Sequence, residues 1–226
     1  MDDLTLETVD RDGAIAEALD GLHDHDTTRA TFLRGAVLGG GALLTAFAAP
    51  ASAAGGKARD ISILNFALTL EELQAAFYTE VEGNGVLKGA LKKQADIVGA
   101  TERAHVRAFR AALGSAAIPT PHFDFGGATE STDDFRRTAV AFEDLAVAAY
   151  KGQAPQISSR AYLASALAIH SVEARHAAWI RRLAGQSPVS GPFDEPKSRA
   201  AVSKIVSATH FLMSTTSQDQ APPFTG

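Results

Sequence analysis

A repeat of chemically distinctive side chains constrains the fold of this 226-residue chain more than any other feature of its sequence. Corresponding members of the repeat are 71 or 72 residues apart, and they are Glu71 and Glu143, Tyr78 and Tyr150, Glu102 and Glu173, and His105 and His176. Each copy therefore carries two glutamates, one tyrosine and one histidine. We expect two copies of one structural unit, paired about a pseudo-two-fold axis.

Glycine and proline residues divide the repeated region into four stretches whose apolar residues recur at helical spacing. The stretches are residues 61–82, 87–113, 131–151 and 158–185. Asp60 is a good N-cap for the first stretch, and Ser131 or Thr132 for the third. The polar connection over residues 115–130 is too long for a simple hairpin, and no stretch alternates with a period of two. The pattern predicts an all-α protein, an up-down four-helix bundle with one longer central connection.

The segments that flank the predicted bundle, residues 55–186, differ from it in composition. Residues 1–54 begin with an acidic leader, which has nine acidic residues among the first 27. Arg29 and Arg34 then precede an uncharged run that ends at Pro50, and small residues follow. This order is typical of a secretory signal, so we expect cleavage near Ala53 and export from the cytoplasm. An uncleaved apolar helix, which would be the only membrane contact, is the alternative. Residues 187–226 form a proline-containing tail with one further short helix over residues 197–212.

The motif Glu-x-x-His occurs twice, on the second and fourth predicted helices, at Glu102/His105 and Glu173/His176. A spacing of three residues places the carboxylate and the imidazole on one helical face, one turn apart. Glu71 and Glu143, on the other two helices, lie among apolar neighbours, where an unpaired carboxylate would be costly. Pairing the two halves brings four carboxylates and two imidazoles to the bundle centre. This is the ligand set of di-iron and di-manganese carboxylate bundles.

Charge and donor type predict the ions and the role of each ligand. Four carboxylates balance two divalent cations, and hard oxygen donors with one nitrogen per ion favour iron or manganese over zinc. We expect Glu102 and Glu173 to bridge two iron or two manganese ions. The expected terminal pairs are Glu71 with His105 and Glu143 with His176, and an exchange of histidines between the pairs stays open.

Two tyrosines belong to the same repeat. Tyr78 follows Glu71 by seven residues, and Tyr150 follows Glu143 by seven, so each shares a helical face with a predicted ligand. We consider two interpretations for both tyrosines. They either act beside the ligands, as supporting or redox-active side chains, or they are core residues whose hydroxyl groups have a hydrogen-bond partner.

These residues give the chain a resemblance to the ferritin-like superfamily, and more narrowly to the exported bacterial ferritin-like proteins that include the desiccation-related group. The motifs that carry it lie within about residues 60–185 and are Asn65-Phe66-Ala67-Leu68-Thr69-Leu70-Glu71, Ala76-Phe77-Tyr78, Glu102-Arg103-Ala104-His105, Ala148-Ala149-Tyr150 and Glu173-Ala174-Arg175-His176. The resemblance implies the four-helix fold and a dinuclear metal site. Ferritins commonly have an aspartate before the glutamate of Glu-x-x-His, whereas Thr101 and Val172 stand there in this chain.

Two functions of different classes follow. The first is an exported metalloenzyme of ferroxidase, peroxidase or catalase type, which oxidises Fe(II) or reduces O2 or peroxide in stress protection. The second is a structural or binding protein of the cell envelope in which the metal is non-catalytic or absent. Metal storage without turnover is a third reading, and a homo-oligomer is compatible with all three. The net charge of −5 argues against nucleic-acid binding, and the lack of cysteine excludes thiolate metal sites and disulfides.

Overall fold

The structure, a computed structural model, describes residues 54–213 of the chain. Its helices are α5 (Ala54–Asn84), α6 (Gly89–Leu113), α7 (Thr132–Gln153), α8 (Arg160–Leu183) and α9 (Arg199–Thr209). Within these residues the backbone forms no β-strand, only one isolated bridge between Phe123 and Leu212. The all-α fold class is thereby confirmed. The predicted signal in residues 1–53 lies outside the described part of the chain.

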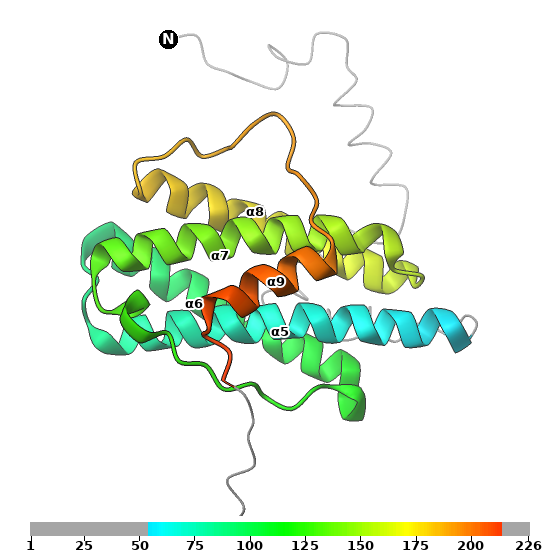
Figure 1. Ribbon diagram of the computed structural model, residues 1–226. Helices are drawn as coiled ribbons and strands as arrows, with labels where there is room; N and C mark the ends of the chain where they lie inside the picture. Colours follow the sequence, from blue (N-terminus) through cyan, green and yellow to red (C-terminus); the bar gives the residue numbers. More distant parts are fainter. Residues whose placement is uncertain (1–53, 214–226) are drawn as a thin grey trace, which may run out of the picture. The chain divides into compact units, whose positions relative to one another are not determined.

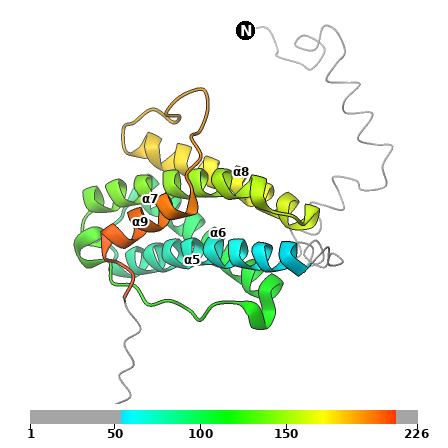
Figure 2. The same ribbon diagram turned by 45° about the vertical axis from the view of Figure 1, so that its right-hand side comes forward.

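The four long helices form two hairpins, α5 with α6 and α7 with α8, which pack against each other (Figure 1). Figure 2 shows the same two layers from another side. Each hairpin contains one copy of the sequence repeat. No helix among residues 54–213 combines the length and the apolar character that crossing a membrane requires.

The long connection between α6 and α7 runs along α5. At its start, the Asn65 side chain donates to the carbonyl of Ala116 and accepts from the amide of Ile118, both at 2.8 Å. At its end, the Asn84 side chain donates to Thr129 at 3.2 Å. Because the connection returns to the end of the bundle where α6 began, α6 and α7 run in the same direction. This crossover brings both copies of the repeat to one level of the bundle.

Asp60 does not cap its own helix, contrary to the sequence prediction, because α5 begins at Ala54. The Asp60 side chain is 3% exposed and accepts the backbone N–H groups of Ser158 and Ser159 at 2.8 and 2.9 Å. Ser159 is the N-cap of α8. Asp60 thus satisfies donors that the start of α8 leaves unpaired, and it ties the two hairpins together.

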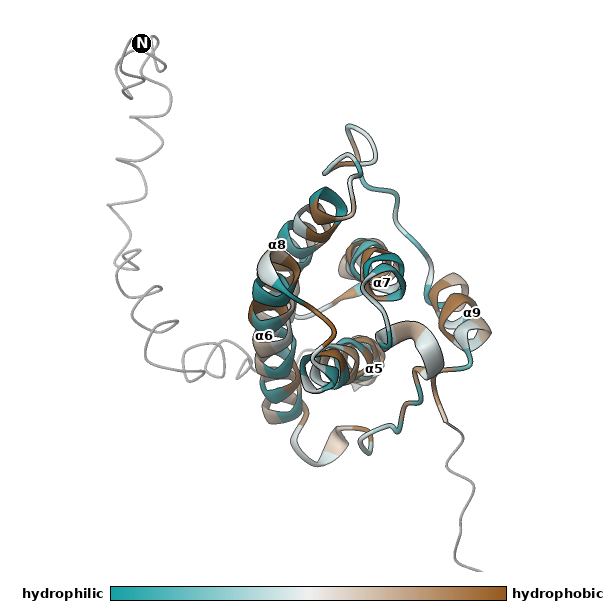
Figure 3. Cartoon of the chain, turned by 90° about the vertical axis from the view of Figure 1, so that its left-hand side faces the viewer, coloured by the Kyte–Doolittle hydropathy of each residue, from teal (hydrophilic) through white to brown (hydrophobic). Residues whose placement is uncertain are grey.

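The tail adds one short helix, α9, beside α5 and α7 on the side away from α6 and α8 (Figure 3). Val202 and Val206 are buried there within the main apolar cluster. The segment before α9 is anchored where the amide of Lys197 donates to the carbonyl of Ala148 at 3.0 Å. Gly152 permits this approach, because a Cβ atom at that position would lie 1.9 Å from the Lys197 carbonyl oxygen.

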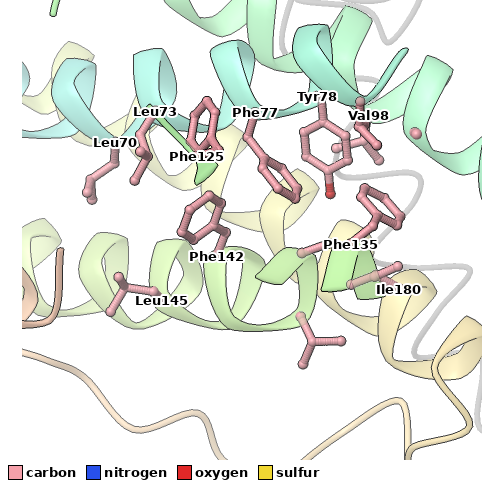
Figure 4. Packing of buried hydrophobic residues seen from close by; sticks show 14 of the residues in the cluster. Leu70, Leu73, Phe77, Tyr78, Val98, Phe125, Phe135, Phe142, Leu145 and Ile180 are labelled. Carbon is pink, nitrogen blue, oxygen red and sulfur yellow. The ribbon is translucent and has the colours of Figure 1, made fainter. Parts of the chain in front are cut away.

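Apolar packing surrounds the centre of the bundle from two sides. One cluster includes Phe77, Tyr78 and Phe135, and the other includes Leu68, Phe109 and Tyr150. Figure 4 shows the first cluster, in which side chains of α5 and α7 face each other. The two tyrosines that the sequence singled out therefore lie in different clusters, one on each side of the bundle centre.

Candidate metal centre

Six polar side chains that the sequence analysis selected lie in the bundle interior. The four glutamates are 0% exposed, and the histidines are 8% and 6% exposed; they are Glu71, Glu102, Glu143, Glu173, His105 and His176. Each of the four long helices contributes at least one of them. α6 and α8 each contribute a carboxylate and an imidazole one turn apart, because the two residues share a helical face.

The six side chains form two groups of four that overlap. One group contains Glu71 and His105, the other contains Glu143 and His176, and both contain Glu102 and Glu173. Within each group, one potential ligand atom per residue lies within 4.8 Å of the others. The two glutamates of the Glu-x-x-His motifs are thus shared, and each remaining glutamate belongs with one histidine.

The histidines lie close to carboxylates of several helices. Nδ1 of His105 is 3.1 Å from Glu71, 3.3 Å from Glu102 and 3.2 Å from Glu173. Nδ1 of His176 is 2.8 Å from Glu102, 3.7 Å from Glu143 and 3.9 Å from Glu173. Contacts between α6 and α8 therefore involve the two shared glutamates, whereas Glu71 and Glu143 approach from α5 and α7.

Several atoms of this centre make no hydrogen bond of acceptable geometry among the described residues, although Nδ1 of His176 lies 2.8 Å from Oε1 of Glu102. These atoms are Oε1 of Glu102, Oε2 of Glu143, both carboxylate oxygens of Glu173 and Nδ1 of His176. Burying a polar atom without a partner is costly, so such atoms need a ligand or a proton. All five belong to groups that ligate divalent cations. The donor set, oxygen-rich with one nitrogen per group of four, fits two metal ions.

The tyrosines cross from one hairpin to the other. The Tyr78 hydroxyl of α5 donates to Oε1 of Glu143 on α7 at 2.6 Å. In the equivalent contact, the Tyr150 hydroxyl of α7 donates to Oε1 of Glu71 on α5. Each tyrosine holds one oxygen of the glutamate that is not shared between the groups. The pseudo-two-fold relation of the sequence repeat thus extends to these hydrogen bonds.

Burial dominates the protonation of the two shared carboxyls in the metal-free chain. It raises the pKa of Glu102 to about 8, and with the charge of Glu102 it raises the pKa of Glu173 to about 7. Burial and the Glu102 charge also raise the pKa of Glu143 well above its usual value. Four carboxylates cannot all ionise in this volume unless positive charge joins them.

Glu71 and His105 form the one pair whose charges support each other. Burial favours the neutral form of Glu71, but the charge and hydrogen bond of His105 outweigh it, and the pKa of Glu71 is lowered. Burial likewise opposes the charge of His105, but Glu71 and two further carboxylates raise the pKa of His105 well above its usual value. Burial lowers the pKa of His176. The two halves therefore differ electrostatically, although their residues correspond.

Two buried glutamines also approach the centre. Gln74, one turn after Glu71 on α5, is 2% exposed and lies beside Glu143. Gln94 is fully buried near the Tyr78 hydroxyl, and the sequence analysis missed it. The repeat spacing of 71 residues relates Gln94 to Ser165, which is also buried. A polar residue at both equivalent positions was the signal that could have revealed it.

Glu72 is not the solvated surface charge that its place beside Glu71 suggests. It is 8% exposed and accepts from Nε of Arg110 at 2.7 Å. Arg110 also donates to the carbonyl of Ile118 in the long connection. Adjacent glutamates on α5 thus face different surroundings, one the bundle centre and the other an ion pair that fastens the connection.

Two comparisons relate the chain to known proteins, and one of them finds a match. A comparison with proteins of curated function finds no match for the chain. The family model described as "Ferritin-like domain" matches residues 59–186, which span α5 to α8 and contain all six side chains of the centre. The chain therefore belongs to the ferritin-like domain family.

Proposed function

We propose that this chain binds two iron or two manganese ions and uses them to oxidise Fe(II) or to reduce O2 or peroxide in stress protection. The observation that carries the proposal is the sharing of Glu102 and Glu173 between two groups of potential ligands. Shared carboxylates are suited to bridge two ions. Glu71 with His105, and Glu143 with His176, are the terminal ligands in this proposal.

Charge supports a pair of divalent ions rather than a single one. Four ionised carboxylates and neutral imidazoles carry a charge of −4, which two divalent cations cancel. Without such cancellation, the buried carboxylates retain protons, as the raised pKa values of Glu102 and Glu173 indicate. Carboxylate and imidazole donors suit iron and manganese, whereas structural zinc sites have fewer ligands.

When bound, two such ions supply one electron each, which with two protons reduces O2 to hydrogen peroxide or hydrogen peroxide to two water molecules. The chain contributes positioning. Tyr78 and Tyr150 each donate to one oxygen of a terminal glutamate and leave its other oxygen for a ligand role. Burial and the adjacent carboxylates raise the pKa of both tyrosines well above its usual value, so both hydroxyls keep their protons. The apolar clusters on both sides limit water around the centre.

The test is metal content combined with turnover. Protein purified from cells grown with iron and manganese, or reconstituted with Fe(II) or Mn(II), should contain two ions per chain. Glu102→Gln should lose at least one ion and the oxidant-dependent activity while its far-ultraviolet circular dichroism stays unchanged. Glu195→Gln, at an exposed position, is the matched control and should behave as wild type.

Three outcomes would contradict the proposal. A chain that takes up no metal under either condition has no dinuclear centre. A chain that binds two ions but neither oxidises Fe(II) nor consumes O2 or peroxide supports the structural or binding role in the cell envelope. Binding of many more than two ions per chain supports storage.

We further propose that the chain is exported. The support is the order of basic, apolar and small residues between Thr28 and Ala53, a segment outside the described residues. It is similar to a twin-arginine signal, with Ala30 in place of the second arginine, so the general secretory route stays open. Protein recovered outside the cytoplasm should begin near Ala54. Recovery of only full-length chain from the cytoplasm would refute export.

A further inference from the structure

The two halves of the bundle differ in how tightly they are filled beside the tyrosines. An apolar cavity lies next to Tyr150, between α5, α6, α7 and α8, and Ile63, Leu70 and Ala149 contribute to its wall. Three further lining residues, Ala67, Ala154 and Ile157, are half-buried, so the cavity extends toward the protein surface. Gln153 is the other lining residue with a polar side chain besides Tyr150.

In the other half, large aromatic residues occupy the equivalent positions. The repeat spacing of 72 residues relates Ala149 to Phe77 and Ile63 to Phe135. The rings of Phe77 and Phe135 stack with their centroids 5.6 Å apart, and both pack on Tyr78, at 5.4 and 6.0 Å (Figure 4). The space that Ala149 and Ile63 leave open beside Tyr150 is therefore filled by two phenyl rings beside Tyr78.

The cavity adjoins the centre at the Glu71 and His105 half. Tyr150, which lines the cavity, donates its hydroxyl to Glu71. Leu70, another lining residue, immediately precedes Glu71 on α5. Tyr150 is thus in contact with both the cavity and the carboxylate of Glu71.

We propose that dioxygen reaches the centre through this cavity, at the Glu71 half. The inference rests on the proposed function and names O2, and not hydrogen peroxide, as the oxidant that enters by this route. Dioxygen is apolar and loses little on entering an apolar cavity, whereas hydrogen peroxide would leave hydrogen-bonding groups unsatisfied there. Apolar cavities in proteins stay dry and take up apolar guests such as xenon. Ala149 is the position that decides access.

The first experiment uses xenon as a probe on the metal-free protein and does not depend on turnover. Xenon should bind beside Tyr150, seen by xenon-dependent shifts of methyl NMR signals such as those of Ile63 and Leu70. Ala149→Phe, which installs the residue of the other half, should abolish these shifts. Ile63→Phe is the second variant if Ala149→Phe does not fold. Ile97→Phe adds the same ring at an exposed position and should leave xenon binding unchanged.

The second experiment uses metal-loaded protein and compares the two oxidants. Ala149→Phe or Ile63→Phe should slow oxidation by O2 and leave metal content and oxidation by hydrogen peroxide unchanged. If the chain binds two ions but xenon does not bind, the inference is overturned and the proposed function stands. Variants that slow oxidation by O2 and by hydrogen peroxide equally would also overturn the inference and leave the proposed function standing. If the chain binds no metal, the proposed function itself fails.

Discussion

Glu173→Gln should stabilise the metal-free protein and weaken the metal-loaded one. Burial and the charge of Glu102 raise the pKa of Glu173 from 4.5 to about 7. At about 1.4 kcal/mol per pKa unit, ionising this carboxyl in the folded chain costs about 3 kcal/mol of folding free energy. A glutamine carries no such charge. The free energy of unfolding of the metal-free variant should therefore exceed that of wild type by about 3 kcal/mol at pH 8.

The difference in unfolding free energy between Glu173→Gln and wild type should depend on pH. A carboxyl whose pKa is raised on folding binds its proton more tightly in the folded state, so stability is full below pH 4.5 and falls as the pH rises through 7. The advantage of Glu173→Gln should therefore vanish near pH 4 and be largest above pH 7. Glu102, whose pKa is raised to about 8, adds a loss of the same sign, so metal-free wild type should become less stable from pH 5 to pH 8.

Chemical denaturation of chelator-treated protein at pH 4 and pH 8 measures this difference. In thermal unfolding, about 3 kcal/mol corresponds to a rise in Tm of roughly 6–12 °C for a domain of this size. Addition of Fe(II) or Mn(II) should reverse the order, because a ligand that binds only the folded state stabilises it and the variant lacks a shared carboxylate. A metal-free Glu173→Gln that is less stable than wild type at pH 8 would refute the reasoning. Glu195→Gln is again the matched control.

Three further changes test other parts of the structure. Asp60→Ala removes the acceptor of two backbone N–H groups at the start of α8 and should cost about 2 kcal/mol in chemical denaturation, whereas an unchanged stability would refute this role. Gly152→Ala should destabilise the protein and speed hydrogen exchange of the Lys197 amide, although alanine favours a helix by about 1 kcal/mol over glycine. Tyr78→Phe should lower metal affinity about 10–100-fold, as loss of a hydrogen bond to a ligand commonly does, and unchanged affinity would contradict the role given to its hydroxyl.

The sequence was informative about the centre because the ligand candidates are placed by their spacing along helices. Glu102 and His105 share a face whatever the rest of the chain does, since three residues span most of one helical turn. The repeat spacing then related each ligand candidate to a partner in the other half. Gln94 was missed because the repeat relates it to Ser165 and not to a second glutamine, so the two positions match only in polarity.

Local signals were less reliable where the partner is distant in sequence. Asp60 is a residue type that commonly caps a helix N-terminus, yet its carboxylate accepts hydrogen bonds from backbone amides 98 and 99 residues away. Glu72 is a residue type that is usually exposed on a helix surface, yet in the fold it accepts a hydrogen bond from Arg110. In both cases the local pattern correctly marks a polar group that needs partners. Which partners it finds depends on how the helices pack.

The sequence by itself determined the helices, the repeat and the identity of the side chains that meet in the interior, because these depend on spacing along a helix of known pitch. Only the tertiary structure decided the route of the long connection and the crossing of Tyr78 and Tyr150 between hairpins. It also decided that a cavity remains beside Ala149, whereas the ring of Phe77 fills the equivalent space in the other half. Such features depend on distances between elements far apart in the chain, which spacing along one helix does not contain.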